Sequence, residues 1–215
     1  MTREVLSESV SEPAPTPLII AQYVPKFLSL NVEILKAVKN GTEQIFDTQN
    51  KIKALVDSAE SAVGKQVENV NEYVKHVEEK AKQVGTNISF CVSEKESAIR
   101  RTNFRILGDC RLERALKHQY AYALKLGKEE VVLSVVVKWC IIKHPVQGDK
   151  LKTCFDDKIK DVKDKIKEFQ NEVGKTIPEA LQYSHKCTKK YLDALNAAID
   201  RIYHNFKICT DEILQ

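Results

Sequence analysis

The sequence has few of the residues that punctuate a chain. Only 7 glycines and 6 prolines occur in 215 residues, too few for a β-sandwich or barrel built from many short strands and turns. It also lacks a Gly-rich phosphate loop, a C-x-x-C pair and a nucleophile at useful spacing from a base. The sequence therefore predicts no catalytic residue, no metal site and no cofactor.

What the sequence does contain suits long helices. It is 43% hydrophobic and 30% charged, so the chain can both bury a core and stay soluble. Lys, Glu, Asp, Val and Ala dominate, as is typical of amphipathic helices. We expect an all-α fold, an elongated or openable helical bundle. A net charge of +4 is too small to indicate a nucleic-acid partner.

Glycines and prolines divide the chain into expected segments. Six glycines follow helical patterns and are expected to end helices, namely Gly41, Gly85, Gly108, Gly127, Gly148 and Gly174. The expected segments are a disordered, Pro-rich stretch at 1–16, an apolar segment broken by Pro25 at 17–41, a Val-rich helix at 42–92, a basic helix with an apolar run at 93–148, and two amphipathic helices at 149–215. Residues 17–215 can also form a single α-helical domain.

A stripe of apolar residues runs along the third of these segments. Its members recur at spacings of three and four and are expected to form a helix seam: Val63, Val67, Val70, Val74, Val77, Val84 and Ile88. Such a seam either packs against other helices, including those of a protein partner, or lies on an apolar interface. Valines bury less area than leucines and lower helix propensity, so the predicted bundle can open.

Positive charge is concentrated between Arg100 and Lys128, a stretch that contains eight Lys or Arg residues and only two acidic residues. At 100° per residue, five of these cations gather on one side of a helix: Arg111, Arg114, Lys117, Lys125 and Lys128. A basic amphipathic helix of this kind suits anionic lipid headgroups, each cation contributing about 1 kcal/mol. An ordinary basic surface helix and a calmodulin target are alternative interpretations of the same pattern. Nucleic-acid binding with the interleaved Phe104, Tyr120 and Tyr122 ranks below the lipid interpretation, because stacking platforms usually lie on sheets.

The run of residues 131–142 follows directly, and ten of its twelve residues are apolar. It is too short to span a bilayer, which takes about 20 residues. It is either a buried core element or a segment that enters one lipid leaflet with Trp139 at the interface. The residues expected to insert are Leu112, Leu116, Tyr120, Val135, Val136, Val137, Trp139, Ile141 and Ile142.

Six scattered cysteines show neither zinc-site nor redox spacing, and we expect free thiols used as small apolar residues. The polar, acidic N-terminal stretch does not have the pattern of a secretory signal. We therefore expect a cytoplasmic protein that is peripheral on its lipid surface. Two glycosylation sequons, at Asn40-Gly41-Thr42 and Asn87-Ile88-Ser89, are interpreted as chance matches for the same reason.

Several short stretches are shared with a known family. Pro17-Leu18-Ile19, Tyr23-Val24-Pro25, Asn40-Gly41, Asn71-Glu72-Tyr73 and Glu78-Glu79 lie in an order that resembles the perilipin family, whose members coat cytosolic lipid droplets. The resemblance implies a non-enzymatic coat on a phospholipid monolayer over neutral lipid, which limits the access of lipases or recruits other proteins. That family favours eleven-residue repeats, whereas the seams here follow a three-four spacing.

Two hypotheses of different class follow. The first is a non-enzymatic protein that binds a lipid surface, a droplet or a membrane, through its amphipathic helices. The second is a soluble helical-bundle or coiled-coil scaffold whose seams are satisfied by protein alone.

Overall fold

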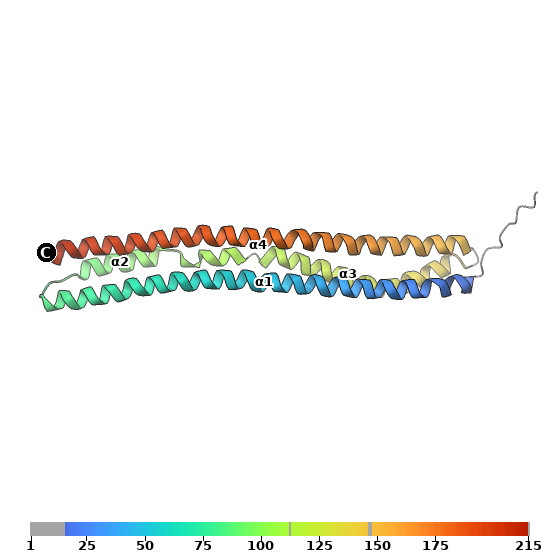
Figure 1. Cartoon of the computed structure of the whole chain (residues 1–215), viewed down its shortest axis with the longest axis horizontal. Coiled ribbons are helices and arrows are strands. Elements are labelled where there is room, and N and C mark those ends of the chain that lie inside the picture. The colour runs from blue at the N-terminus through green and yellow to red at the C-terminus, as the bar shows by residue number, and fades with distance from the viewer. Residues whose placement is uncertain (1–15, 112, 146–147, 215) are drawn as a thin grey trace, which may run out of the picture. The chain divides into compact units, whose positions relative to one another are not determined.

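The computed structural model describes residues 16–111, 113–145 and 148–214. Every regular element in these ranges is a helix, and the predicted all-α fold is confirmed. In chain order the elements are α1 (Thr16–Gln83), α2 (Ser89–Arg101), the 3₁₀ helix η1 (Phe104–Arg111), α3 (Glu113–Lys143) and α4 (Gly148–Leu214) (Figure 1). The predicted disorder of residues 1–16 falls almost wholly outside the described residues.

The helices form two compact units. Unit 1 comprises residues 1–44 and 118–174, and unit 2 comprises residues 45–117 and 175–215. Because α1 and α4 are long, each contributes one part to each unit. Within each unit, segments far apart in the sequence form a helical bundle.

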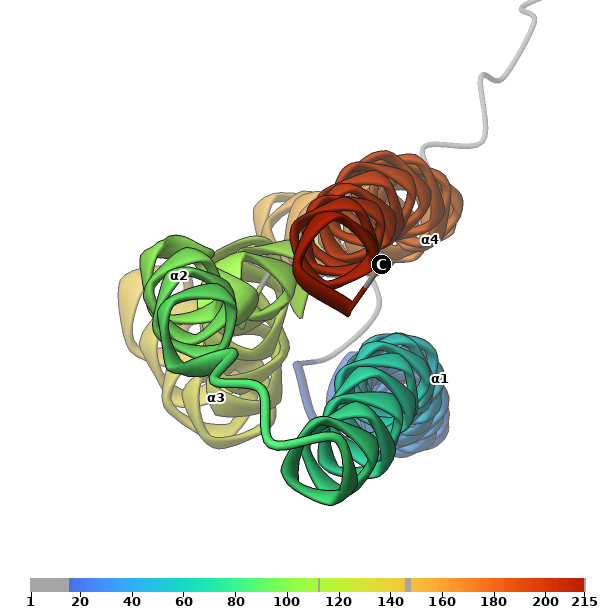
Figure 2. The ribbon, with the colours of Figure 1, turned by 90° about the vertical axis from the view of Figure 1, so that its left-hand side faces the viewer.

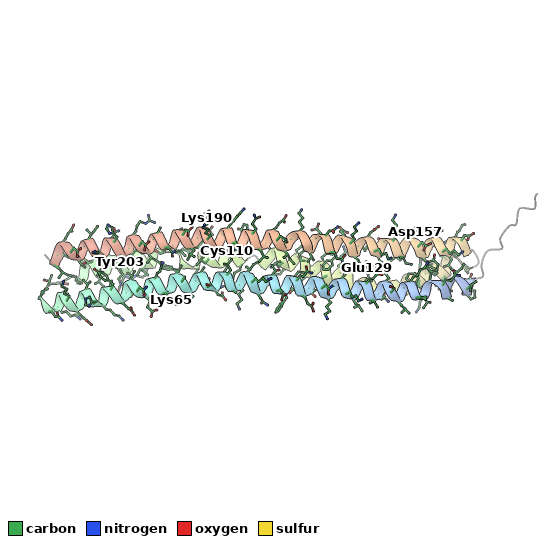
Figure 3. All side chains as sticks on the ribbon, viewed as in Figure 1. Lys65, Cys110, Glu129, Asp157, Lys190 and Tyr203 are labelled. Carbon is green, nitrogen blue, oxygen red and sulfur yellow. A yellow bond between two sulfur atoms is a disulfide. The ribbon has the colours of Figure 1, made fainter. Side chains whose placement is uncertain are left out.

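The core of unit 2 combines valines of α1 with leucine, isoleucine and aromatic residues of α4. Val56, Val63 and Val70 of α1 pack in one cluster with Leu195 and Phe206 of α4, and α2 and η1 also contribute. Figure 2 shows α1, α2 and α4 arranged around this interior. In Figure 3 the exposed lysines Lys65 and Lys190 project from the outer sides of α1 and α4, whereas Cys110 lies among the helices.

The core of unit 1 is built around aromatic rings. Tyr23 and Phe27 of α1 both contact Phe155 of α4, with ring centroids 5.1 and 5.3 Å apart. Tyr122 of α3 meets Phe169 of α4 edge to face at 5.5 Å. These rings join α1, α3 and α4 within unit 1.

The helix α1 is continuous for 68 residues. The predicted break at Pro25 and the segment boundary at residue 41 are therefore wrong. Pro25 faces solvent, and its cost in a helix interior, about 3 kcal/mol, is offset because Tyr23 and Phe27 on either side are buried against Phe155. Gly41 does not end a helix. A Cβ at this position would lie 2.5 Å from Cε1 of the Phe169 ring, so glycine is needed for close approach.

The helix α4 is likewise continuous, over 67 residues. The prediction of two helices in 149–215 is therefore wrong, and neither Gly174 nor Pro178 interrupts the helix. Both are exposed, whereas Val173 and Ala180 beside them are buried. The energy of burying this face outweighs the local preference of glycine and proline for breaks.

The segments between α1 and α3 follow local capping rules. Gly85 adopts a left-handed φ of +71°, and the hydrogen bonds from Thr86 N to Ala81 O and from Gly85 N to Lys82 O close α1 as a Schellman motif. Among the six predicted helix ends, the one at Gly85 is therefore confirmed. Gly108 lies within η1 and Gly127 within α3, and Gly148 begins α4, so those predicted ends are wrong.

The buried positions repeat every eleven residues. In α1 one series consists of Ala37, Thr48, Ala59, Val70 and Ala81, and in α4 one consists of Leu151, Val162, Val173, Ser184, Leu195 and Phe206. Eleven residues make three turns of about 3.67 residues, close to the natural period of an α-helix, whereas a seven-residue repeat drifts by about 20° per repeat. The buried stripe therefore repeats every eleven residues, whereas the predicted seam, with its alternating spacings of three and four, repeats every seven.

The exposure of the valines at heptad spacing reflects the drift of a seven-residue repeat around the helix. Val56, Val63, Val70, Val77 and Val84 are 0, 4, 6, 7 and 61% exposed, in that order. Each step of seven moves the side chain further from the core face, and the last valine lies beyond the end of α1 at Gln83. The assignment of Val84 to the seam is therefore wrong.

All six cysteines are paired, as Cys91–Cys209, Cys110–Cys187 and Cys140–Cys154. The prediction of free thiols is wrong, because the pairs join different helices and the spacing of cysteines along one chain does not reveal which helices are neighbours. In unit 2 the bonds tie α2 and η1 to α4, and in unit 1 the third ties α3 to α4. No cysteine occurs between residues 16 and 83, so α1 lies outside all three bonds.

Candidate functional site

The five cations predicted to bind headgroups do not lie on one helix. Arg111 ends η1, and its guanidinium lies 2.9 Å from Asp57 Oδ1 and 3.0 Å from Glu60 Oε2, both on α1. It therefore fastens η1 to α1 within unit 2. Lys117, Lys125 and Lys128 are exposed on α3. Arg114 also lies on α3, but its side chain is not among those described.

The predicted insertion residues separate into buried and exposed groups. Leu116 is fully buried and belongs to the core. Tyr120, Val137 and Ile141 are half-buried, so the protein itself covers part of each side chain. Val135, Trp139 and Ile142 are exposed. Leu112 falls outside the described residues, as does the side chain of Val136. Of the residues expected to insert into lipid, only these three are therefore both described and exposed.

The predicted seam is largely a core seam. Val63, Val70, Val74 and Val77 are buried in the cluster of unit 2, and Val67 packs against it. Ile88 is buried in the same cluster, but it precedes α2 and does not continue α1. Except for Val84, these side chains are therefore satisfied by the protein itself.

A second apolar face, not predicted from the sequence, lies at the start of α1. Between residues 17 and 35 the helix buries one side in unit 1, including Ile19, Tyr23 and Phe27. At 100° per residue, a further set of exposed side chains centres about 150° away, on the opposite side of the helix. These residues, which we term the outer face, are Leu18, Ala21, Val24, Leu28, Val32 and Leu35.

The outer face carries no charge. The charged residues between 17 and 35 are Lys26 and Glu33, and both fall on the flank of the helix between the outer face and the core face. Lys26 Nζ lies 4.1 Å from the centre of the Tyr23 ring. The signal was available in the sequence as an apolar run on both sides of one helix, which an amphipathic helix of a soluble bundle does not need.

A smaller exposed apolar patch lies near the end of α3, also in unit 1. Val135, Trp139 and Ile142 share one side of the helix. Lys143 Nζ lies 4.5 Å from the Trp139 ring centre, in the geometry of a cation–π contact. Trp with neighbouring lysines is typical of side chains at a membrane–water interface.

Charged groups between α3 and α4 in unit 1 neutralise one another. Glu129 (Figure 3) accepts a hydrogen bond from Lys165 Nζ at 2.9 Å, and Asp161 lies 3.0 Å from Lys158 Nζ. The bond to Glu129 raises the pKa of Lys165, and the bond from Lys158 lowers the pKa of Asp161. The network therefore fastens two helices.

A cavity of about 390 Å³ lies beside this network, lined in part by His118, Tyr122 and Lys125. Burial, followed by a hydrogen bond to Glu168, raises the pKa of Tyr122 to about 12. A phenol with so high a pKa stays protonated at neutral pH and is a poor general base. Among the described residues, no group of three or more His, Cys, Asp or Glu side chains is placed to hold a metal ion.

Among the residues that the structure describes, one helix is apolar enough by length and composition to cross a membrane. It is α1, where an 18-residue window near the N-terminus passes this test with 28% of its residues buried. Core helices of soluble proteins and signal sequences have the same composition. In unit 1 the buried part of α1 contacts α4 through Tyr23 and Phe27.

No protein-family model, curated protein or solved structure matches this chain.

Proposed function

We propose that this is a non-enzymatic protein that binds a lipid surface through the outer face of α1. The observation that carries the proposal is the charge-free outer face, lying opposite the core face of the same helix. Contiguous exposed apolar patches mark interaction sites. A lipid surface suits this one because its residues form a single ridge along about five turns of helix, roughly 27 Å at 1.5 Å per residue.

The binding energy expected from this face is modest. Leu18, Leu28 and Leu35 are 51, 61 and 51% exposed. Fully burying such a side chain is worth roughly 1.5–3 kcal/mol, so each contributes about 1 kcal/mol on entering lipid. With the two valines the total is about 5 kcal/mol, which corresponds to reversible binding. The patch around Trp139, with its lysines, adds a second contact from the same unit.

Binding in this way does not require the bundle to open. The residues of the outer face already point away from the core of unit 1, so α1 can meet a lipid surface while Tyr23 and Phe27 stay packed. Lys125 and Lys128 remain candidates for headgroup contacts, whereas Arg111 is already engaged by two carboxylates.

The proposal includes an oxidising compartment. Three disulfides are typical of proteins that fold outside the reducing cytosol, whereas the perilipin resemblance implies a cytosolic droplet. Trapping thiols with an alkylating agent during isolation from the native cells decides between them. Six protected cysteines fit the oxidising compartment, and six alkylated cysteines fit the cytosolic droplet.

Flotation tests the lipid contact directly. The purified protein is mixed with artificial droplets and with neutral or anionic vesicles, at low and at high salt. We expect the wild-type protein to float, and Leu18→Gln, Leu28→Gln and Leu35→Gln combined to reduce the floating fraction at least tenfold. Glutamine keeps helix propensity, so the circular dichroism spectrum should not change.

A matched control uses exposed apolar residues of unit 2. Phe90, Ile208 and Ile213 are also exposed, and their combined replacement by glutamine should leave flotation unchanged. If both triple variants float as well as wild type, or if the wild-type protein does not float at all, the outer face is not a lipid site. The scaffold hypothesis then takes its place, with a protein partner covering the outer face.

A further inference from the structure

The sequon Asn87-Ile88-Ser89 spans the end of the turn after α1 and the first residue of α2. Asn87 and Ser89 are exposed, and so are Val84 and Gly85 just before them. The disulfide Cys91–Cys209 forms only two residues after the sequon. Disulfides and N-linked glycans are acquired in the same type of compartment, so a disulfide beside the sequon favours its modification.

The turn holds the sequon in a compact, accessible conformation. The side-chain Oδ1 of Asn87 accepts a hydrogen bond from the backbone N–H of Ser89 at 2.9 Å, which is an Asx turn across the three residues of the sequon. This bond occupies the oxygen of the amide and leaves its nitrogen, Nδ2, as the atom to be modified. Ile88 is buried in the core of unit 2, so the sequon is anchored while its asparagine stays exposed.

The second sequon has a different setting. Asn40 lies inside α1, and the hydroxyl of Thr42 donates hydrogen bonds to Val38 O and Lys39 O at 2.9 Å. Gly41, between them, is buried against Phe169. An enzyme acting on Asn40 would have to unwind a packed helix, whereas Asn87 is already in a surface turn.

We propose that Asn87 carries an N-linked glycan and that Asn40 does not. The donor is a lipid-linked oligosaccharide diphosphate. A bond forms between Asn87 Nδ2 and the anomeric carbon of the first sugar, and the bond from that carbon to the diphosphate oxygen breaks. The amide loses one proton, the lipid diphosphate leaves, and no group is oxidised or reduced. A glycan at this turn extends into solvent without displacing a core side chain.

Expression of the full chain behind a secretion leader in cultured eukaryotic cells tests this assignment. The secreted, disulfide-bonded protein should migrate faster after treatment with an endoglycosidase, by one glycan. Asn87→Gln and Ser89→Ala should each abolish the shift, and the matched control Asn40→Gln should retain it. Mass spectrometry of the wild-type peptide locates the sugar without relying on any variant.

A secreted wild-type protein with no endoglycosidase-sensitive shift, or a glycan mapped to Asn40 alone, overturns the proposal. This outcome is separable from the proposed function, because flotation uses protein made in bacteria without glycans. Unglycosylated protein that floats, with no glycan on the secreted form, leaves the lipid site in place and removes the glycan.

Discussion

At Gly41 the backbone of α1 passes directly beside the ring of Phe169, and an added Cβ would lie 2.5 Å from two ring atoms. Gly41→Ala should therefore lower the free energy of unfolding by about 1–3 kcal/mol, as overpacking does, although alanine is the better helix former. Chemical unfolding followed by circular dichroism measures the change.

The same substitution at Gly174 serves as the control. Gly174 also lies in a helix of unit 1, but beyond its own stretch of helix no atom lies within 4 Å of the position that its Cβ would take. Gly174→Ala should stabilise the protein by up to about 1 kcal/mol. Equal effects at the two positions would show that Phe169 does not crowd α1.

The glycines and prolines show how far the conformation of a single residue can be predicted from the sequence. Gly85 is a helix end in the sequence and in the structure, because its positive φ is a local property. Pro25 and Gly41 were misjudged because aromatic rings from α4 determine their surroundings. Local conformational preference predicts a residue correctly only where no distant side chain overrides it.

At the scale of elements, Arg111 is an attachment between η1 and α1. Arg111→Glu would place a third carboxylate beside Asp57 and Glu60, and we expect it to lower the stability of the protein by about 1–2 kcal/mol. The basic-helix hypothesis instead expects lost lipid binding with unchanged stability. Thermal unfolding and flotation of one variant separate the two.

Lys128 provides the comparison for this prediction. It is exposed on α3, and Lys128→Glu should leave the melting temperature unchanged while reducing salt-sensitive binding to anionic vesicles. A melting temperature lowered equally by both variants would contradict the attachment role of Arg111.

Helix existence was predictable from the sequence, but helix length and period were not. The apolar stripe from Val63 to Val77 was found correctly because burial follows helical spacing. The eleven-residue period of the buried positions was not visible in the apolar pattern, because some of these positions are polar. Thr48 of α1 and Ser184 of α4 are examples that are buried nevertheless. Likewise the run from Leu18 to Leu35 indicates a helix with two apolar sides, but it does not reveal which side another helix covers.

For the molecule as a whole, the disulfides should contribute unequally. Cys91 and Cys209 are 118 residues apart, and Cys140 and Cys154 are 14 apart. Because Cys110–Cys187 lies inside the first loop and stays closed, opening Cys91–Cys209 frees only the segments outside it, roughly 40 residues. In the chain-entropy account, loops of roughly 40 and 14 residues correspond to about 4 and 3 kcal/mol. Replacing the first pair by serines should therefore destabilise the protein by about 1 kcal/mol more than replacing the second.

Urea unfolding of the two double-serine variants, each compared with wild type under oxidising conditions, measures this difference. A larger loss from the short loop would indicate that the bond between α3 and α4 acts through the folded state of unit 1 rather than through chain entropy.

The absence of cysteine from α1 has a consequence for how the chain is held together. From α2 onward the elements are joined by the backbone and by three disulfides, whereas α1 is joined covalently through one exposed turn at residues 84–87. If the backbone were cut once in that turn, α1 would no longer be joined covalently to α2 and the elements that follow, and it would bind them as a ligand. The stability that α1 contributes could then be measured as a dissociation constant, by titration with a synthetic helix.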